Sequence, residues 1–145
     1  MEASLNYLKE LFALGNTDIK TYSPLTLAYI GDAVYELAVR EYLLGRGEAH
    51  NKELHRRAVE LVRAEKQSEL YDVLCGLLGD EEKEVMRHGR NAKGGHQPPH
   101  TSVGAYRRAT GVEALVGWLY LRGDKEKLQL IFEQLFANDS KENEQ

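Results

Sequence analysis

Two acidic residues in apolar surroundings are the first candidates for chemistry in this chain. Asp32 lies within residues 25–37, and Glu113 is the single acid within residues 111–121; both stretches have apolar residues on every side of a helical wheel. Moving an ionised carboxylate into a protein interior costs on the order of several kcal/mol unless a cation or strong hydrogen-bond donors compensate it. The two acids therefore predict a shared cation at the meeting of two helices.

Carboxylate oxygens favour a hard cation. Mg²⁺ keeps several waters and often binds through one or two protein carboxylates together with a substrate phosphate, a requirement that Asp32 and Glu113 meet. With one cysteine, Cys75, and no Glu-x-x-His pair, the sequence gives little support to a zinc or a ferritin-like di-iron site. Glu36, one helical turn after Asp32, is either a group that contacts the metal's ligands or waters, or the acid at the solvent-exposed margin of that helix face.

The charge of the chain is unevenly distributed. The net charge is −4, but residues 85–112 carry five basic residues and no acid, whereas the remainder carries 14 basic and 23 acidic residues, a net charge of −9. The basic residues of this block are Arg87, Arg90, Lys93, Arg107 and Arg108. Within it, residues 89–102 hold three glycines and two of the three prolines, which predicts a long loop. An acid-free basic segment in an acidic protein favours contact with phosphates over a merely solvated surface.

Helical periodicity dominates the rest of the chain and no strand alternation is evident, so we expect an all-α fold. The expected helices cover residues 5–15, 24–44, 51–78 (as one helix, or as two with a break near 64–68), 80–89, 102–121 and 125–136. The length suits a single domain over residues 1–137 followed by a frayed polar tail, 138–145. Cys75 is expected in the core. Without a basic N-terminal region or an apolar run of about 18 residues, the chain is predicted to be cytoplasmic, with no membrane partner.

The two acidic helices carry a family resemblance. Residues 27–37, around Gly31-Asp32, resemble the signature helix of the ribonuclease III endonuclease domain, and residues 112–117, beginning Val112-Glu113, resemble its second acidic helix. The resemblance covers essentially the whole chain. A full ribonuclease III continues into a double-stranded-RNA-binding domain where this chain stops, so the sequence is expected to be the compact bacterial form of the family.

That resemblance implies a Mg²⁺-dependent endoribonuclease with a ribonuclease III-like helical fold. Asp32 and Glu113 would be the catalytic residues and the metal ligands, in a homodimer whose signature helices pack across a two-fold axis and line a cleft for double-stranded RNA. Each site would hydrolyse one strand and leave 5′-phosphate and 3′-hydroxyl ends. The expected substrate is precursor 23S ribosomal RNA, and a ribosomal protein that shapes this RNA is a candidate partner.

The basic block resembles the RNA-contacting loop of the compact form, over residues 87–93 and their Gly/Pro-rich continuation. A-form RNA is recognised mainly through its shape, phosphates and 2′-hydroxyls, so these contacts need no base code. The candidate RNA-binding residues are Arg87, Arg90, Asn91, Lys93, His96, Gln97 and His100.

Three positions depart from the family pattern. Ribonuclease III generally has further acids four and seven residues before the signature aspartate and three residues before the second-helix glutamate; here these positions hold Ala28, Leu25 and Thr110. Fewer protein ligands favour one Mg²⁺ per site over two. The departures also support an alternative, a non-catalytic ribonuclease-III-like RNA-binding module; a helical protein-interaction module is a third interpretation.

Each acid also has a purely structural interpretation. Asp32 could be a capped or salt-bridged core residue, and Glu113 could pair with Arg107 or Arg108, about one turn away on the same helix. Neither interpretation explains why both helices carry the same anomaly.

Overall fold

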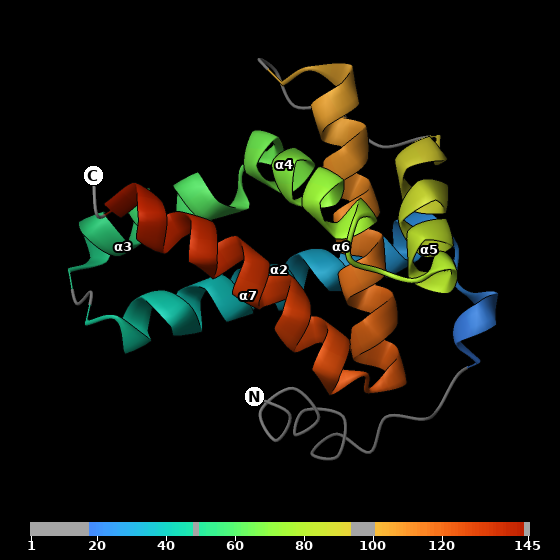
Figure 1. Cartoon of the computed structure of the whole chain (residues 1–145), viewed down its shortest axis with the longest axis horizontal. Coiled ribbons are helices and arrows are strands. Elements are labelled where there is room, and N and C mark those ends of the chain that lie inside the picture. Colours follow the sequence, from blue (N-terminus) through green and yellow to red (C-terminus); the bar gives the residue numbers. More distant parts are fainter. Residues whose placement is uncertain (1–17, 48–49, 94–100, 144–145) are drawn as a thin grey trace.

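The computed structural model describes residues 18–47, 50–93 and 101–143, and over these residues the chain is helical without a strand (Figure 1). A short 3-10 helix, η1 (Ile19–Thr21), precedes the α-helices. These are α2 (Pro24–Gly45), α3 (Asn51–Val62), α4 (Ala64–Cys75), α5 (Asp80–Asn91), α6 (Val103–Arg122) and α7 (Lys125–Asn143). The predicted all-α fold is confirmed. The helix expected at residues 5–15 lies outside the described residues.

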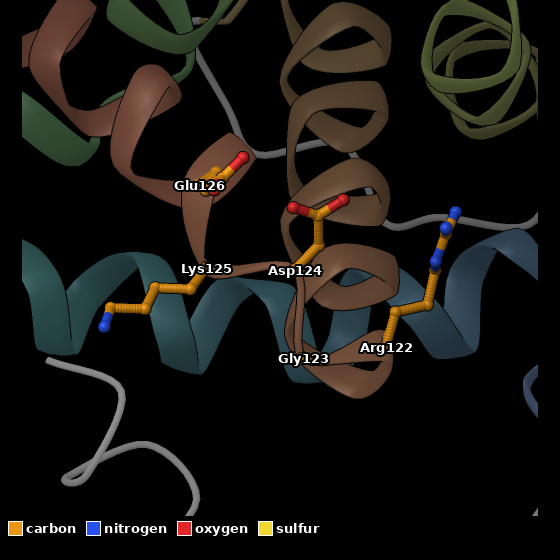
Figure 2. Close-up of a pocket in the computed structure, with 5 residues that line it drawn as sticks. All are labelled: Arg122, Gly123, Asp124, Lys125 and Glu126. Atoms are coloured by element: carbon orange, nitrogen blue, oxygen red, sulfur yellow. The ribbon is translucent and has the colours of Figure 1, made fainter.

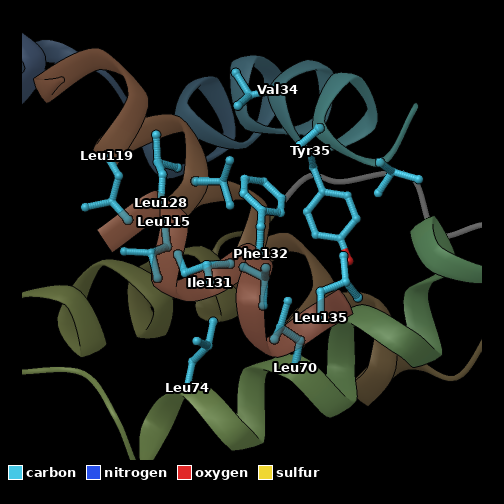
Figure 3. Packing of buried hydrophobic residues seen from close by; sticks show 14 of the residues in the cluster. Val34, Tyr35, Leu70, Leu74, Leu115, Leu119, Leu128, Ile131, Phe132 and Leu135 are labelled. Atoms are coloured by element: carbon cyan, nitrogen blue, oxygen red, sulfur yellow. The ribbon is translucent and has the colours of Figure 1, made fainter. Parts of the chain in front are cut away.

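Helix α6 is the centre of the fold. It crosses α2 and also packs against α4, α5 and α7, so that elements far apart in the sequence meet along it (Figure 1). The main core lies where α2, α4, α6 and α7 converge, around Tyr35, Leu74, Leu115 and Ile131, which are fully buried (Figure 3). Each such side chain contributes about 1.5–3 kcal/mol on burial. This core fixes α2 and α6, the two helices that carry the acids.

The ends of α2 and α6 follow from local sequence signals. Ser23 accepts a hydrogen bond from the Thr26 amide at 3.2 Å, and Pro24 occupies the first turn of α2, as its sequence predicts. Ser102 caps α6 in the same way through the Ala105 amide at 3.1 Å. At the other end of α6, Gly123 adopts a left-handed conformation with φ of 73°, which ends the helix.

Two helix boundaries differ from the sequence expectation. The break between α3 and α4 falls at Arg63, whose backbone is extended, rather than within residues 64–68. Helix α5 continues to Asn91, so Gly89 and Arg90 are helical instead of opening the loop. Gly89 is a packing residue there, since a Cβ on it would lie 2.8 Å from the Ala114 Cβ and 2.9 Å from the Gly111 Cα.

The last helix is longer than expected. Helix α7 runs to Asn143 instead of ending near residue 136, so most of the predicted frayed tail is helical. Asp139 explains the extension, because its buried carboxylate accepts hydrogen bonds from Arg57 of α3 at 2.8 and 3.0 Å and from the Tyr42 hydroxyl of α2 at 2.9 Å. These contacts tie a polar segment to the body of the domain.

The position of Cys75 also differs from the expectation. Cys75, expected in the core, is exposed because it is the final residue of α4, one position beyond the buried Leu74. Among the helices of the described ranges, none combines the length and apolarity that crossing a bilayer requires.

Candidate active site

Helices α2 and α6 approach so closely that each needs a glycine opposite the other's backbone. A Cβ built on Gly31 of α2 would lie 1.7 Å from the Glu113 carbonyl oxygen, and one on Gly117 of α6 would lie 2.0 Å from the Leu27 carbonyl oxygen. The contact is reciprocal, since each glycine stands four residues after a residue whose carbonyl faces the other helix. The missing side chain of Gly31 thus allows the backbone of α6 to approach α2 closely.

This crossing brings Asp32 and Glu113 together. Their side chains are within hydrogen-bonding reach of each other. Burial, this hydrogen bond, and the negative charges of Asp32 and Glu36 raise the pKa of Glu113 to about 9. Glu113 therefore keeps its proton at neutral pH.

The burial of the two acids is unequal. Glu113 is half-buried, whereas Asp32 is exposed, which corrects the expectation that it lies in the interior. The buried side of α2 is formed instead by its neighbours Gly31, Val34 and Tyr35. Solvent therefore reaches the pair on the side of Asp32, whereas the contact between α2 and α6 covers the opposite side.

Three residues near the acid pair, Glu36, Tyr35 and Arg108, have contacts that fix their positions. Glu36 is half-buried and lies 3.8 Å from the Arg40 guanidinium, and its charge acts on Glu113. Tyr35 stands on the interior side, where its hydroxyl donates to the Leu61 carbonyl at 3.0 Å; burial, with a smaller effect of the Glu113 charge, raises its pKa. Arg108 donates to Ser68 at 2.6 Å, so its side chain is held by α4 rather than by Glu113.

The donor set fits a hard cation. Asp32 and Glu113 supply carboxylate oxygens, and a divalent ion would replace the proton that Glu113 otherwise holds. At the three positions where the family has further acids, Ala28 and Thr110 are buried and Leu25 is half-buried; the Thr110 hydroxyl donates to the Tyr106 carbonyl at 3.0 Å. Over the described residues no group of three or more His, Cys, Asp or Glu side chains is arranged to hold a metal.

The predicted RNA-binding residues have different surroundings. Arg87 on α5 makes a two-point contact with Glu84, at 2.7 and 3.2 Å. Arg90 lies over the Tyr71 ring, with its guanidinium carbon 5.9 Å from the ring centroid, and donates to Asn91 at 3.2 Å. Asn91 and Lys93 are exposed. The remaining candidates, His96, Gln97 and His100, lie outside the described residues.

A separate surface hollow of about 450 Å³ lies at the turn between α6 and α7, and neither acid of the pair lines it (Figure 2). Its charged side chains are of both signs, namely Arg122, Asp124, Lys125 and Glu126. Asp124 caps α7 by accepting from the Lys127 amide at 3.3 Å. This mixture of charges is typical of a solvated turn, so the acid pair remains the candidate active site.

The sequence did not indicate the role of Gly117, the counterpart of Gly31 across the helix crossing. The available signal was the position of Gly117 four residues after Glu113 in an apolar helix, where glycine costs about 1 kcal/mol relative to alanine and therefore needs a packing reason. The partner of each glycine could not be read from the spacing, because it depends on how the two helices cross.

Comparisons with known proteins identify the family of this chain. Residues 25–124, which include both acids, match the Ribonuclease III domain family. The chain is 46% identical to a Mini-ribonuclease 3 of Symbiobacterium thermophilum, over 78% of this chain and 87% of that protein. It is 41% identical to the Mini-ribonuclease 3 of a Thermoanaerobacter species, over 92% and 94% of the two chains.

A solved structure shares the fold of this chain. A crystal structure of a protein from Fusobacterium nucleatum superposes with a TM-score of 0.75 at 31% identity, over 84% of this chain and 98% of that one. Together with the paired acids, these similarities confirm the resemblance carried by the two acidic helices. The chain therefore belongs to the ribonuclease III family of endoribonucleases and, within that family, to the Mini-ribonuclease 3 group.

Proposed function

We propose that this endoribonuclease is a cytoplasmic, Mg²⁺-dependent homodimer that cleaves double-stranded RNA at the Asp32–Glu113 pair. The observation that carries the proposal is the convergence of these two carboxyl groups from α2 and α6, with the pKa of Glu113 raised to about 9. An acid perturbed in this way, beside a second carboxyl group and open to solvent on one side, is typical of a functional site. Within this substrate class we propose precursor 23S ribosomal RNA, on the basis of the family resemblance, and a ribosomal protein that shapes the RNA as a candidate partner.

Asp32 and Glu113 would hold the metal ion, one per site. When bound, Mg²⁺ supplies an activated water and stabilises negative charge on the phosphate. Glu113 would give up its proton on metal binding and act with Asp32 as an oxygen ligand. Glu36, whose charge already reaches Glu113, would orient the metal's ligands or waters without binding the metal itself. Hydrolysis of the bond to the 3′-oxygen would leave 5′-phosphate and 3′-hydroxyl ends.

The surface of α2 supports a homodimer. Tyr29, Leu37 and Leu44 are large apolar side chains that are 83%, 39% and 60% exposed, and their spacing places them on one side of the helix. Asp32 and Glu36 lie on the same side. A second copy of this helix packed across a two-fold axis would cover these apolar side chains and bring two acid pairs to one surface.

A cleavage assay tests the proposal. A long RNA duplex is incubated with the protein with and without Mg²⁺, and with Asp32→Ala, Glu113→Ala and a control, Glu41→Ala, which removes an exposed acid from the same helix. We expect cleavage that requires Mg²⁺, a loss of at least about 100-fold with either site variant, and no loss with the control.

The products and two other outcomes complete the test. Mapping the ends should find 5′-phosphates and 3′-hydroxyls, and a precursor 23S duplex should be cut at defined positions near its base-paired ends. Unchanged cleavage by both site variants would disprove the residue assignment. Binding of the duplex by the wild-type protein with no cleavage under any metal condition would favour the non-catalytic RNA-binding module.

A further inference from the structure

A second candidate contact for nucleic acid lies at the N-terminal end of α6, around Arg108. Its Nε donates to the Ser68 hydroxyl of α4 at 2.6 Å, which fixes the direction of the guanidinium. Its two terminal nitrogens lie beside the bare backbone of Gly104, where a Cβ would be 3.5 Å from each of them. Among the residues that the structure describes, no carboxylate forms an ion pair with Arg108, in contrast to Arg87, which Glu84 holds. The guanidinium is therefore oriented but not neutralised.

Arg90 lies on the same side of the molecule. Its guanidinium carbon is 5.9 Å from the centroid of the Tyr71 ring on α4. The charges of Arg90 and Arg108 both act on the Tyr71 hydroxyl and oppose the burial that raises its pKa. Ser68, which holds Arg108, precedes Tyr71 by three residues and lies on the same face of α4. Asp72 and Cys75 are the other charged or titratable groups that act on this hydroxyl. Two cations thus stand close together where α4, α5 and α6 meet.

We propose that Arg108 and Arg90 form a phosphate-binding site that binds the backbone of the RNA duplex outside the cleavage centre. A guanidinium presents its N–H groups in a planar fork that matches two oxygens of a phosphodiester, and a fork held in advance loses less entropy on binding. Ser68 provides this preorganisation for Arg108, and the missing side chain of Gly104 leaves room beside its terminal nitrogens. The site rests on the proposed function, because it presupposes that the ligand is double-stranded RNA.

Arg108 is separated from the acid pair along its own helix. It precedes Glu113 by five residues on α6, about 7.5 Å along the axis, and points to α4 rather than to α2. A phosphate bound there is not the phosphate that is cleaved. The site therefore adds affinity and register to RNA binding by this domain.

The experiment measures binding of a fluorescent RNA duplex over a series of KCl concentrations, in Ca²⁺ without Mg²⁺ so that no cleavage intervenes. Arg108→Ala should weaken binding about tenfold and reduce the slope of log affinity against log salt by about 0.9 for each phosphate that the variant no longer neutralises. Arg108→Lys should keep the slope but bind more weakly, because it retains the charge and lacks the fork. Ser68→Ala should bind more weakly at an unchanged slope, since it removes the preorganisation alone.

Arg56→Ala is the matched control. It removes the same charge from α3, where Glu53 and Glu60 pair with Arg56, and it should leave affinity and slope as in the wild type. Thermal unfolding of each variant establishes that the folded protein is compared. If Arg108→Ala binds with the affinity and slope of Arg56→Ala while the wild-type protein binds and cleaves duplex RNA, the proposed site is wrong and the proposed function stands. If the wild-type protein neither binds nor cleaves the duplex, the proposed function fails and the site fails with it.

Discussion

The Cα of Gly31 lies directly against the backbone carbonyl of Glu113, so close that a Cβ at position 31 would stand 1.7 Å from its oxygen. Asp32 follows this glycine on α2. Glu113 contributes both the carbonyl that contacts Gly31 and the side chain that faces Asp32. The helix crossing therefore sets the relative position of the two carboxyl groups directly, without an intervening loop or side chain. A single backbone contact therefore determines both the packing of the two helices and the position of the proposed site.

Replacing Gly31 with alanine should disrupt this contact. The added methyl group would overlap backbone atoms of α6, which cannot move aside as a flexible side chain can, so we expect destabilisation by more than about 3 kcal/mol or failure to fold. Gly45→Ala at the end of α2 is the control, because a Cβ there meets no atom within 4 Å, and it should change stability by no more than about 1 kcal/mol. Urea unfolding followed by circular dichroism compares the two; equal stability would contradict the packing role of Gly31.

The helices and the pairing of the acids could be predicted because local signals specify them. Ser23-Pro24 and Ser102 begin α2 and α6, and an isolated acid in each apolar helix marks the residues that meet. The family resemblance extended this to the fold and the enzyme class. Neither the local signals nor the family resemblance depends on interatomic distances.

Other features depend on contacts that a single sequence does not reveal. The apolar neighbours of Asp32 suggested burial, but Tyr29 and Leu37 are themselves exposed, so an apolar helical wheel did not distinguish a core face from a surface face. The polar segment after residue 137 gave no sign of the partners that Asp139 finds on α2 and α3. Both errors come from tertiary contacts that override local composition.

Ionisation of Glu113 should destabilise the metal-free protein. Its pKa of about 9 in the folded state exceeds its ordinary value of 4.5, so the folded state binds the proton more tightly and stability falls as pH rises from about 5 to about 9. Glu113→Gln lacks this ionisation and should be more stable than the wild type at pH 8 by on the order of 1 kcal/mol, while losing cleavage. Thermal unfolding in a metal chelator across this pH range tests it, with Glu41→Gln as the control. Parallel pH profiles for wild type and Glu113→Gln would contradict the assignment.

A charge on the exposed face of α2 should prevent dimer formation. Leu37 is 39% exposed on the same side of the helix as Tyr29 and Leu44, so Leu37→Asp would place an unpaired carboxylate in the proposed interface. We expect a monomer with reduced cleavage by size-exclusion chromatography with light scattering and by the duplex assay. Val59→Asp on α3, where the valine is 47% exposed, should remain dimeric. A wild-type protein that is monomeric at all concentrations would refute the dimer proposal.

The end of α7 should contribute to the stability of the whole domain through Asp139. Its carboxylate accepts two hydrogen bonds from Arg57 and one from Tyr42, and both partners of the ion pair are largely buried, with side chains 12% and 7% exposed for Arg57 and Asp139. Asp139→Ala removes the carboxylate and leaves the Arg57 charge in a desolvated position, which should cost about 3 kcal/mol. Asp80→Ala, at a fully exposed acid on α5, is the control and should leave the free energy of unfolding close to that of the wild type. Denaturant unfolding measures both; a destabilisation by Asp139→Ala no larger than that of the control would mean that the segment after residue 137 does not stabilise the domain.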